Sequence, residues 1–109
     1  MAEDEQSGTA LVVRLEDMME FVKGGIVSRT VVETEKMEID LFMISKGQGL
    51  SEHTSSKDAV VQVTVGEGVV TLGQMSHVAG PGSLFYIPAD LPHSLEATED
   101  MAFLLILLK

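Results

Sequence analysis

Short segments that alternate apolar and polar residues, separated by glycine-rich turns, are the feature that most constrains this fold. Turn sequences occur at residues 66–68, 73–74 and 80–82. The spacing leaves no room for helical crossovers, so it predicts an all-β sandwich or barrel. We expect residues 26–33 to pair with 37–45, and 60–65 to pair with 69–72 through the turn between them. The expected strands are 26–33, 37–45, 60–65, 69–72, 84–87, 93–97 and 101–108.

The N-terminal part of the chain has a different pattern. Residues 1–8 are acidic and polar and predict a flexible tail, which leaves residues 9–109 as a single domain. Residues 10–13 are predicted to form a first strand. Over residues 15–22 the apolar positions follow a helical spacing, which predicts a short helix or a helical turn. They are Leu15, Met18, Met19 and Val22.

Composition and charge exclude several classes of function. The chain has no cysteine, so disulfides, thiolate metal sites and cysteine nucleophiles are excluded. Its formal net charge of −10 disfavours binding to nucleic acids and to anionic membranes. The first residues do not resemble a signal peptide, and the apolar run 102–108 is shorter than the roughly 20 residues that span a bilayer. A soluble, cytoplasmic protein is therefore expected.

The last expected strand is apolar at both odd and even positions, from Phe103 to Leu108. Side chains alternate between the two faces of a sheet, so both faces of this strand should be buried. One face can fill a barrel. A second sheet layer, the N-terminal segment or another subunit must cover the other, because an uncovered strand of this kind aggregates. We predict a homodimer on this basis.

Two segments resemble the conserved motifs of the cupin family. The first cupin motif is Gly, five residues, His-x-His, three or four residues, Glu, six residues and Gly. Gly47, His53 and Gly66 occupy its places. The second motif is Gly, five residues, Pro-x-Gly, two residues, His, three residues and Asn. Gly82, Pro88 and His93 match that motif, whereas Asp90 and Ala97 replace its second Gly and its Asn.

The resemblance covers residues 26–109 and extends to a group of small single-domain cupins. It implies a double-stranded β-helix, a jelly-roll barrel of two antiparallel sheets around a pocket. Metal-binding cupins hold a divalent ion such as Fe, Mn, Zn or Ni with three histidines and one glutamate. The resemblance places His53 and His93 on two of these positions and puts Ser55 and Ala59 on the other two.

Two imidazoles alone bind such a metal weakly, because functional sites have three or more protein ligands. Glu52 and Asp58 are the nearby carboxylates. Each neighbours a residue that faces the pocket, so pleating should turn it away. A bulge near residues 54–57 would bring Asp58 into the pocket as a speculative third ligand.

Three functions stay open at this point: a metal-independent small-molecule binding module, a metal-dependent dioxygenase or isomerase that uses His53 and His93, and a structural dimer without a pocket function. General acid–base catalysis on a bound small molecule is also chemically possible. We expect His77 at the surface and Arg29 in solvent or in an ion pair. The residues predicted to form the pocket for a small, largely apolar ligand are His53, Ser55, Ala59, Val61, Phe85 and His93, with Val63 beside them.

Overall fold

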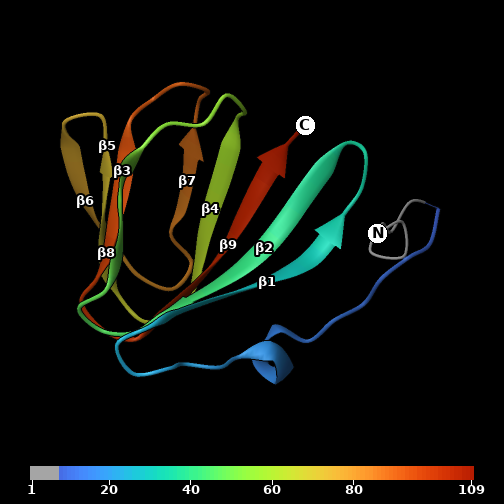
Figure 1. Cartoon of the computed structure of the whole chain (residues 1–109), viewed down its shortest axis with the longest axis horizontal. Helices are drawn as coiled ribbons and strands as arrows, with labels where there is room; N and C mark the ends of the chain where they lie inside the picture. The colour runs from blue at the N-terminus through green and yellow to red at the C-terminus, as the bar shows by residue number, and fades with distance from the viewer. Residues whose placement is uncertain (1–7) are drawn as a thin grey trace.

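Two antiparallel β-sheets packed face to face form the protein in the computed structural model, which describes residues 8–109 (Figure 1). One sheet has the strand order β1-β2-β9-β4-β7 and the other has the order β3-β8-β5-β6. This arrangement confirms the expected jelly-roll barrel. The strands are β1 (Ile26–Glu33), β2 (Met37–Ile44), β3 (Gly49–His53), β4 (Ala59–Val65), β5 (Gly68–Leu72), β6 (Met75–Ala79), β7 (Leu84–Ile87), β8 (His93–Ala97) and β9 (Met101–Leu108).

The predictions for the N-terminal part of the chain agree with the structure only in part. The sequence pattern predicted a strand at residues 10–13, but the structure contains no regular element there. The helical pattern over residues 15–22 yields one turn of 3-10 helix at Leu15–Met18. The predicted flexible tail lies outside the described residues, apart from Gly8.

One predicted strand pair is wrong. Residues 60–65 and 69–72 do not form a hairpin, because β4 pairs with β7 and β9 whereas β5 pairs with β6 and β8. The intervening Gly66 carries the chain from one sheet to the other with a φ of 77°. Glycine adopts this left-handed conformation without steric cost, whether or not the flanking strands pair. The turn was therefore recognisable from the sequence, but its role as a sheet-to-sheet crossover was not.

Strand β9 lies in the centre of the five-stranded sheet, between β2 and β4 (Figure 1). On the inner face, Phe103 lies opposite Phe42 of β2 and Val63 of β4, and the two phenylalanine rings stack with centroids 5.2 Å apart. Phe103 is the largest fully buried side chain. It anchors the core between the sheets, together with Ile44, Val61, Val70, Ile87, Leu95 and Met101.

The N-terminal segment covers part of the outer face of the same sheet. Leu15, Met18, Met19 and Phe21 pack against a second cluster made by Leu41, Met43, Ala102 and Leu104. Polar contacts hold the segment in place. The Glu20 carboxylate pairs with Arg29 at 2.8 Å, and the Gly24 amide donates to the Ser45 hydroxyl oxygen at 2.9 Å. The expected ion pair of Arg29 is therefore confirmed, and its partner lies on this covering segment.

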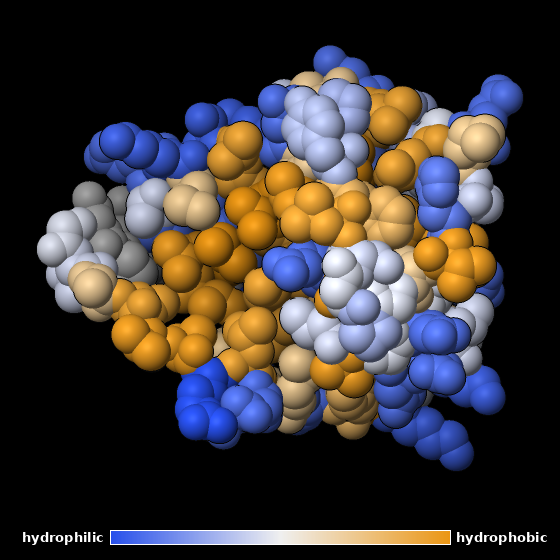
Figure 2. All heavy atoms as spheres, turned by 180° about the vertical axis from the view of Figure 1, so that it is seen from behind, coloured by the Kyte–Doolittle hydropathy of each residue, from blue (hydrophilic) through white to orange (hydrophobic). Residues whose placement is uncertain are grey.

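Apolar side chains remain at the surface, and Figure 2 shows them gathered on the face seen from behind. Val12 is 92% exposed, and Leu84 and Tyr86 of the edge strand β7 are 60% and 57% exposed. The homodimer that was inferred from the apolar last strand stays a prediction. Among residues 8–109, no helix is long and apolar enough to cross a membrane.

The crossover at Gly66 gives a test of the fold. A Cβ atom at this position would collide with the carbonyl oxygen of Asp100, in addition to the strain of a φ of 77°. We expect Gly66→Ala to lower the free energy of unfolding by about 3 kcal/mol or more, since the left-handed backbone alone costs about 1–2 kcal/mol. Urea unfolding followed by far-UV circular dichroism measures the loss.

Gly82→Ala is the matched control for this prediction. Gly82 has a φ of 89°, but no atom lies within 4 Å of the position that an added Cβ would take. Its replacement should therefore cost only the backbone strain, about 1–2 kcal/mol. Equal losses for the two variants would contradict the importance of the close approach at Gly66.

Candidate functional site

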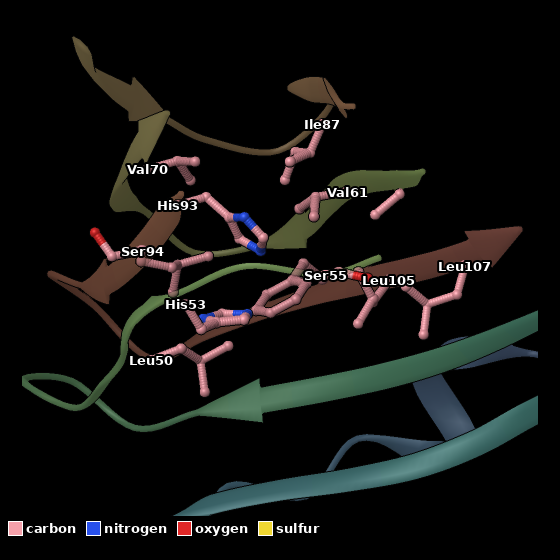
Figure 3. Close-up of a pocket in the computed structure, with 13 residues that line it drawn as sticks. Leu50, His53, Ser55, Val61, Val70, Ile87, His93, Ser94, Leu105 and Leu107 are labelled. Atoms are coloured by element: carbon pink, nitrogen blue, oxygen red, sulfur yellow. The ribbon is translucent and has the colours of Figure 1, made fainter. Parts of the chain in front are cut away.

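A cavity of about 240 Å³ lies between the two sheets (Figure 3). Its wall is built mainly from aliphatic and aromatic side chains, with four polar residues among them. Among the described residues that line it, none is an aspartate, glutamate, lysine or arginine. The lining residues are Leu50, His53, Ser55, Ala59, Val61, Val70, Ile87, His93, Ser94, Leu95, Phe103, Leu105 and Leu107.

The two histidines face each other across neighbouring strands. His53 at the end of β3 lies opposite His93 at the start of β8, and a bulge after Leu50 allows both Leu50 and His53 to line the cavity. The ring centroids are 4.2 Å apart and the ring planes are inclined by 61°. His53 is exposed at the cavity mouth, whereas His93 is half-buried. Figure 3 shows both rings directed into the cavity.

Backbone contacts determine the tautomer of both imidazole rings. The Nδ1 atom of His53 lies 2.8 Å from the carbonyl oxygen of Ser51, and the Nδ1 atom of His93 lies 2.8 Å from that of Leu91. A carbonyl oxygen can only accept a hydrogen bond, so each Nδ1 carries the hydrogen and donates it. In the neutral ring, the Nε2 atom then bears a lone pair. No hydrogen bond joins either Nε2 atom to another residue of the described chain 8–109.

Ser55 and Ala59 lie in the cavity wall. The amide of Asp90 donates to the Ser55 carbonyl oxygen at 2.7 Å, which ties the loop after β7 to the segment after β3. The Ser55 hydroxyl oxygen accepts the Lys57 amide at 3.1 Å. Ala59 is 2% exposed, and its methyl group leaves open the space that a longer side chain would fill. Val61, also predicted for the pocket, lies next to it in the wall.

The remaining candidate residues lie elsewhere. Phe85 is not among the lining residues. It packs against the core cluster, with its ring centroid 6.2 Å from that of the exposed His77. The Asp58 carboxylate accepts the Ala89 amide at 2.9 Å. Asp58 thus fastens the loop after β7 and does not line the cavity, and Glu52 is exposed within the β3 bulge.

The cavity does not supply the protein ligands of a stable divalent metal site. Within residues 8–109 there is no group of three or more histidine, aspartate, glutamate or cysteine side chains placed to hold an ion. The two Nε2 atoms are suitable donors, but a serine hydroxyl and a methyl group stand beside them. The bulge considered for residues 54–57 occurs earlier in β3 instead, between Leu50 and His53.

Carboxylates gather on β1 and β2 near the cavity. Asp40 and Glu38 lie opposite Leu105 and Leu107 in the register, and Glu33 lies opposite Glu38. A hydrogen bond with Asp40 raises the pKa of the Glu38 carboxyl. Burial and the negative charges of Asp40 and Glu33 act in the same direction, and Lys109 opposes them. This cluster places carboxylates beside the two cavity-lining leucines of β9.

Comparison with known proteins gives the family. The model of the cupin domain family matches residues 40–108, which is more than half of the chain. This protein belongs to the cupin family. The sequence motifs and the strand order described above agree with that assignment.

Solved structures include similar proteins. A conserved protein of unknown function from Streptococcus pyogenes is 30% identical, with a TM-score of 0.83 over 96% of this chain and 92% of that chain. A cupin 2 conserved barrel domain protein from Leptotrichia buccalis is 32% identical, with a TM-score of 0.80 over 86% of this cupin and 46% of that chain. The DMSP lyase of Ruegeria pomeroyi, 13% identical with a TM-score of 0.72 over 77% of this cupin and 47% of that chain, shares the fold alone. Among curated proteins there was no match.

A departure from the second cupin motif has a conformational consequence. Asp90 stands where the motif has glycine, and its φ is 70°, the only positive value at a non-glycine residue in the described chain. Aspartate tolerates this conformation better than most residues, but it still bears a steric cost that glycine does not. The motif position therefore keeps its backbone conformation in this cupin although the residue has changed.

Replacing Asp90 by glycine should stabilise the protein. We expect Asp90→Gly to raise the free energy of unfolding by about 0.5–1 kcal/mol, because the relief of steric strain exceeds the added entropy of the unfolded chain. Chemical denaturation would measure the change. Asp90→Ala serves as the comparison and should be less stable than wild type. A glycine variant less stable than wild type would mean that the aspartate side chain makes a stabilising contact.

The carboxylate cluster predicts a pH-dependent stability. Because the folded-state pKa of Glu38 lies above its ordinary value of 4.5, its contribution to stability is complete below that pH and is lost as the pH rises through the folded-state pKa. Glu38→Gln removes the repulsion between opposed like charges. It should raise the melting temperature by about 1–4 °C at pH 7, equivalent to a few tenths of a kcal/mol, and by nothing at pH 4.

Calorimetry across this pH range measures the difference between Glu38→Gln and wild type. Glu35→Gln removes the same charge from the exposed turn between β1 and β2 and is the matched control. If both variants raised the melting temperature equally at pH 7, the effect would come from net charge and not from the carboxylate cluster.

Proposed function

We propose that this cupin binds a small, uncharged and largely apolar molecule in the cavity between its sheets, without a resident metal ion. The observation that carries the proposal is the cavity wall itself. Carbon atoms of residues such as Val61, Val70 and Phe103 form most of it, and polar groups gather at the two histidines and Ser55. An apolar cavity with a few convergent polar groups is the usual form of a small-molecule site.

Cavity size limits the ligand. A volume of about 240 Å³ is small beside the roughly 300–1,000 Å³ of sites for drug-sized molecules. An engineered apolar cavity of about 150 Å³ accommodates benzene. A substituted single ring or a short branched chain is therefore the size of molecule that we propose.

Charge limits the ligand further. The described lining residues provide no lysine or arginine for an anion and no carboxylate for a cation. Burial of an unpaired charge in such a wall would cost several kcal/mol. The carboxylates of Asp40 and Glu38 beside the cavity, together with the net charge of −10, also repel anions. These features support a neutral ligand.

A metal-dependent cupin enzyme, a dioxygenase or isomerase, is the second candidate. The observation that favours it is the pair of Nε2 lone pairs on His53 and His93, which are the donors that divalent iron, manganese, nickel or zinc prefer. This function would require the substrate to complete the ligand set, since Asp58 and Glu52 do not line the cavity. A purely structural dimer, the third possibility, has no need for an open cavity. The cytoplasmic location also stays a prediction.

Metal content distinguishes the first two candidates. We expect untagged protein, purified without chelators, to contain iron, manganese, nickel and zinc far below one ion per chain by inductively coupled plasma mass spectrometry. The His53→Ala, His93→Ala double variant should give the same values, because two imidazoles bind these ions weakly. His77→Ala, at the exposed histidine of β6, is the control for nonspecific binding.

Binding of toluene tests the positive part of the proposal. Titration should shift the amide resonances of residues around the cavity in wild-type protein, and Ala59→Leu should suppress the shifts by filling the space beside Ala59. Near-stoichiometric metal that disappears in the double histidine variant would instead establish the metal-dependent candidate.

A further inference from the structure

We infer that the polar group recognised in this cavity is a hydroxyl, so that the ligands are neutral alcohols and phenols. The inference rests on the proposed small-molecule binding and goes beyond it by naming the chemical class. It follows from which cavity atoms can donate a hydrogen bond and which can accept one, and both are determined by contacts with the backbone.

Histidine supplies the acceptors. Each Nδ1–H donates to a carbonyl oxygen two residues earlier in its own chain segment, at 2.8 Å in both rings. In the neutral ring, each Nε2 atom therefore offers a lone pair and no hydrogen. His93 is half-buried, whereas His53 is exposed at the mouth. Because a hydrogen bond gains more in a water-poor environment, the His93 Nε2 atom is the principal acceptor of the ligand hydroxyl.

Ser55 supplies the donor. Its hydroxyl oxygen accepts the Lys57 amide at 3.1 Å, and its own hydrogen is available to donate. Ser94 also lines the cavity, but Figure 3 shows its hydroxyl pointing away from the two histidine rings. The Nε2 acceptors and the Ser55 hydroxyl donor thus line the same cavity. A ligand hydroxyl complements them, because it donates one hydrogen bond and accepts others.

Other polar groups fit less well. A ketone or an ether can accept from Ser55 but leaves the His93 lone pair without a partner, and an unmet buried acceptor costs binding energy. A carboxylate would place its lone pairs against those of the two Nε2 atoms, near Asp40 and Glu38. With the hydroxyl at the mouth, the apolar body of an alcohol or phenol lies against Val61, Val70 and Phe103 deeper in the cavity.

Two ligands of nearly equal shape test the inference. In 4-methylphenol a hydroxyl replaces one methyl group of p-xylene, and both molecules are single rings. Titration by NMR gives their affinities for wild-type protein and for His93→Phe, which keeps an aromatic ring but loses the Nε2 acceptor. The ratio of the 4-methylphenol affinity to the p-xylene affinity should fall roughly tenfold in His93→Phe. Ser55→Ala should lower the same ratio severalfold.

His77→Phe is the matched control, because His77 lies on β6 outside the cavity, and the ratio should not change. Circular dichroism and amide spectra confirm that each variant is folded. Long-range ¹⁵N–¹H spectra of the imidazole rings give a readout without ligand, in which both histidines should carry their hydrogen on Nδ1. Addition of 4-methylphenol should then shift the His93 Nε2 resonance, and p-xylene should not.

The outcomes separate this inference from the proposed function. Binding of both ligands with a ratio that His93→Phe leaves unchanged would overturn hydroxyl recognition while supporting an apolar binding cavity. Hydrogen on Nε2 in the free protein would also overturn the inference. If neither ligand bound wild-type protein even at millimolar concentration, the proposed binding function would itself fail, and hydroxyl recognition with it.

Discussion

The rest of the structure depends on the need to bury both faces of β9. Its odd residues Phe103, Leu105 and Leu107 face the second sheet, and its even residues Ala102 and Leu104 face the N-terminal segment. A strand of this kind is stable only in the middle of a sheet, and β2 and β4 flank it on both sides. The jelly roll satisfies this constraint, because it places the last strand between two strands from earlier in the chain.

The cavity follows from the same arrangement and from two small side chains. Phe103 fills the space where its ring stacks on Phe42, but farther along β9 the partner of Leu107 on β4 is Ala59. The resemblance to metal-binding cupins places a glutamate there and a histidine at Ser55. A methyl and a hydroxymethyl group in their place leave space between the sheets open beside Ala59 and Ser55. The loss of ligands and the gain of volume are thus one structural change.

The sequence predicted strand positions well, because the local alternation of apolar and polar residues determines them. It predicted strand pairing less well, because pairing depends on residues far apart in the chain. Alternation and turn residues gave Leu84–Ile87 and Met101–Leu108 with their observed bounds. The supposed hairpin around Gly66 failed because a glycine turn allows either a hairpin or a crossover, and the choice depends on β9 occupying the edge of β4. Residues 10–13 have the composition of a strand but find no strand to pair with. His53, Ser55, Ala59 and His93 were placed in the pocket from the motifs, and Val61 and Phe85 from the expected barrel. All of them line the cavity except Phe85, which packs against the core.

The histidine tautomers could not be predicted from the sequence, because they depend on the positions of backbone carbonyl groups at the bulge in β3 and in the loop before β8. Those carbonyls accept the Nδ1 hydrogens whether or not anything occupies the cavity. In a complete metal site the same contacts would orient the rings toward the ion, because a histidine that binds a metal through one ring nitrogen commonly donates a hydrogen bond from the other. Here a serine hydroxyl and a methyl group take the other two ligand positions, and under the proposed function the same ring orientation suits a neutral ligand. Two Nε2 lone pairs held beside an apolar wall favour an apolar ligand that carries a hydrogen-bond donor. Because backbone hydrogen bonds already fix both rings, binding requires little further loss of conformational entropy.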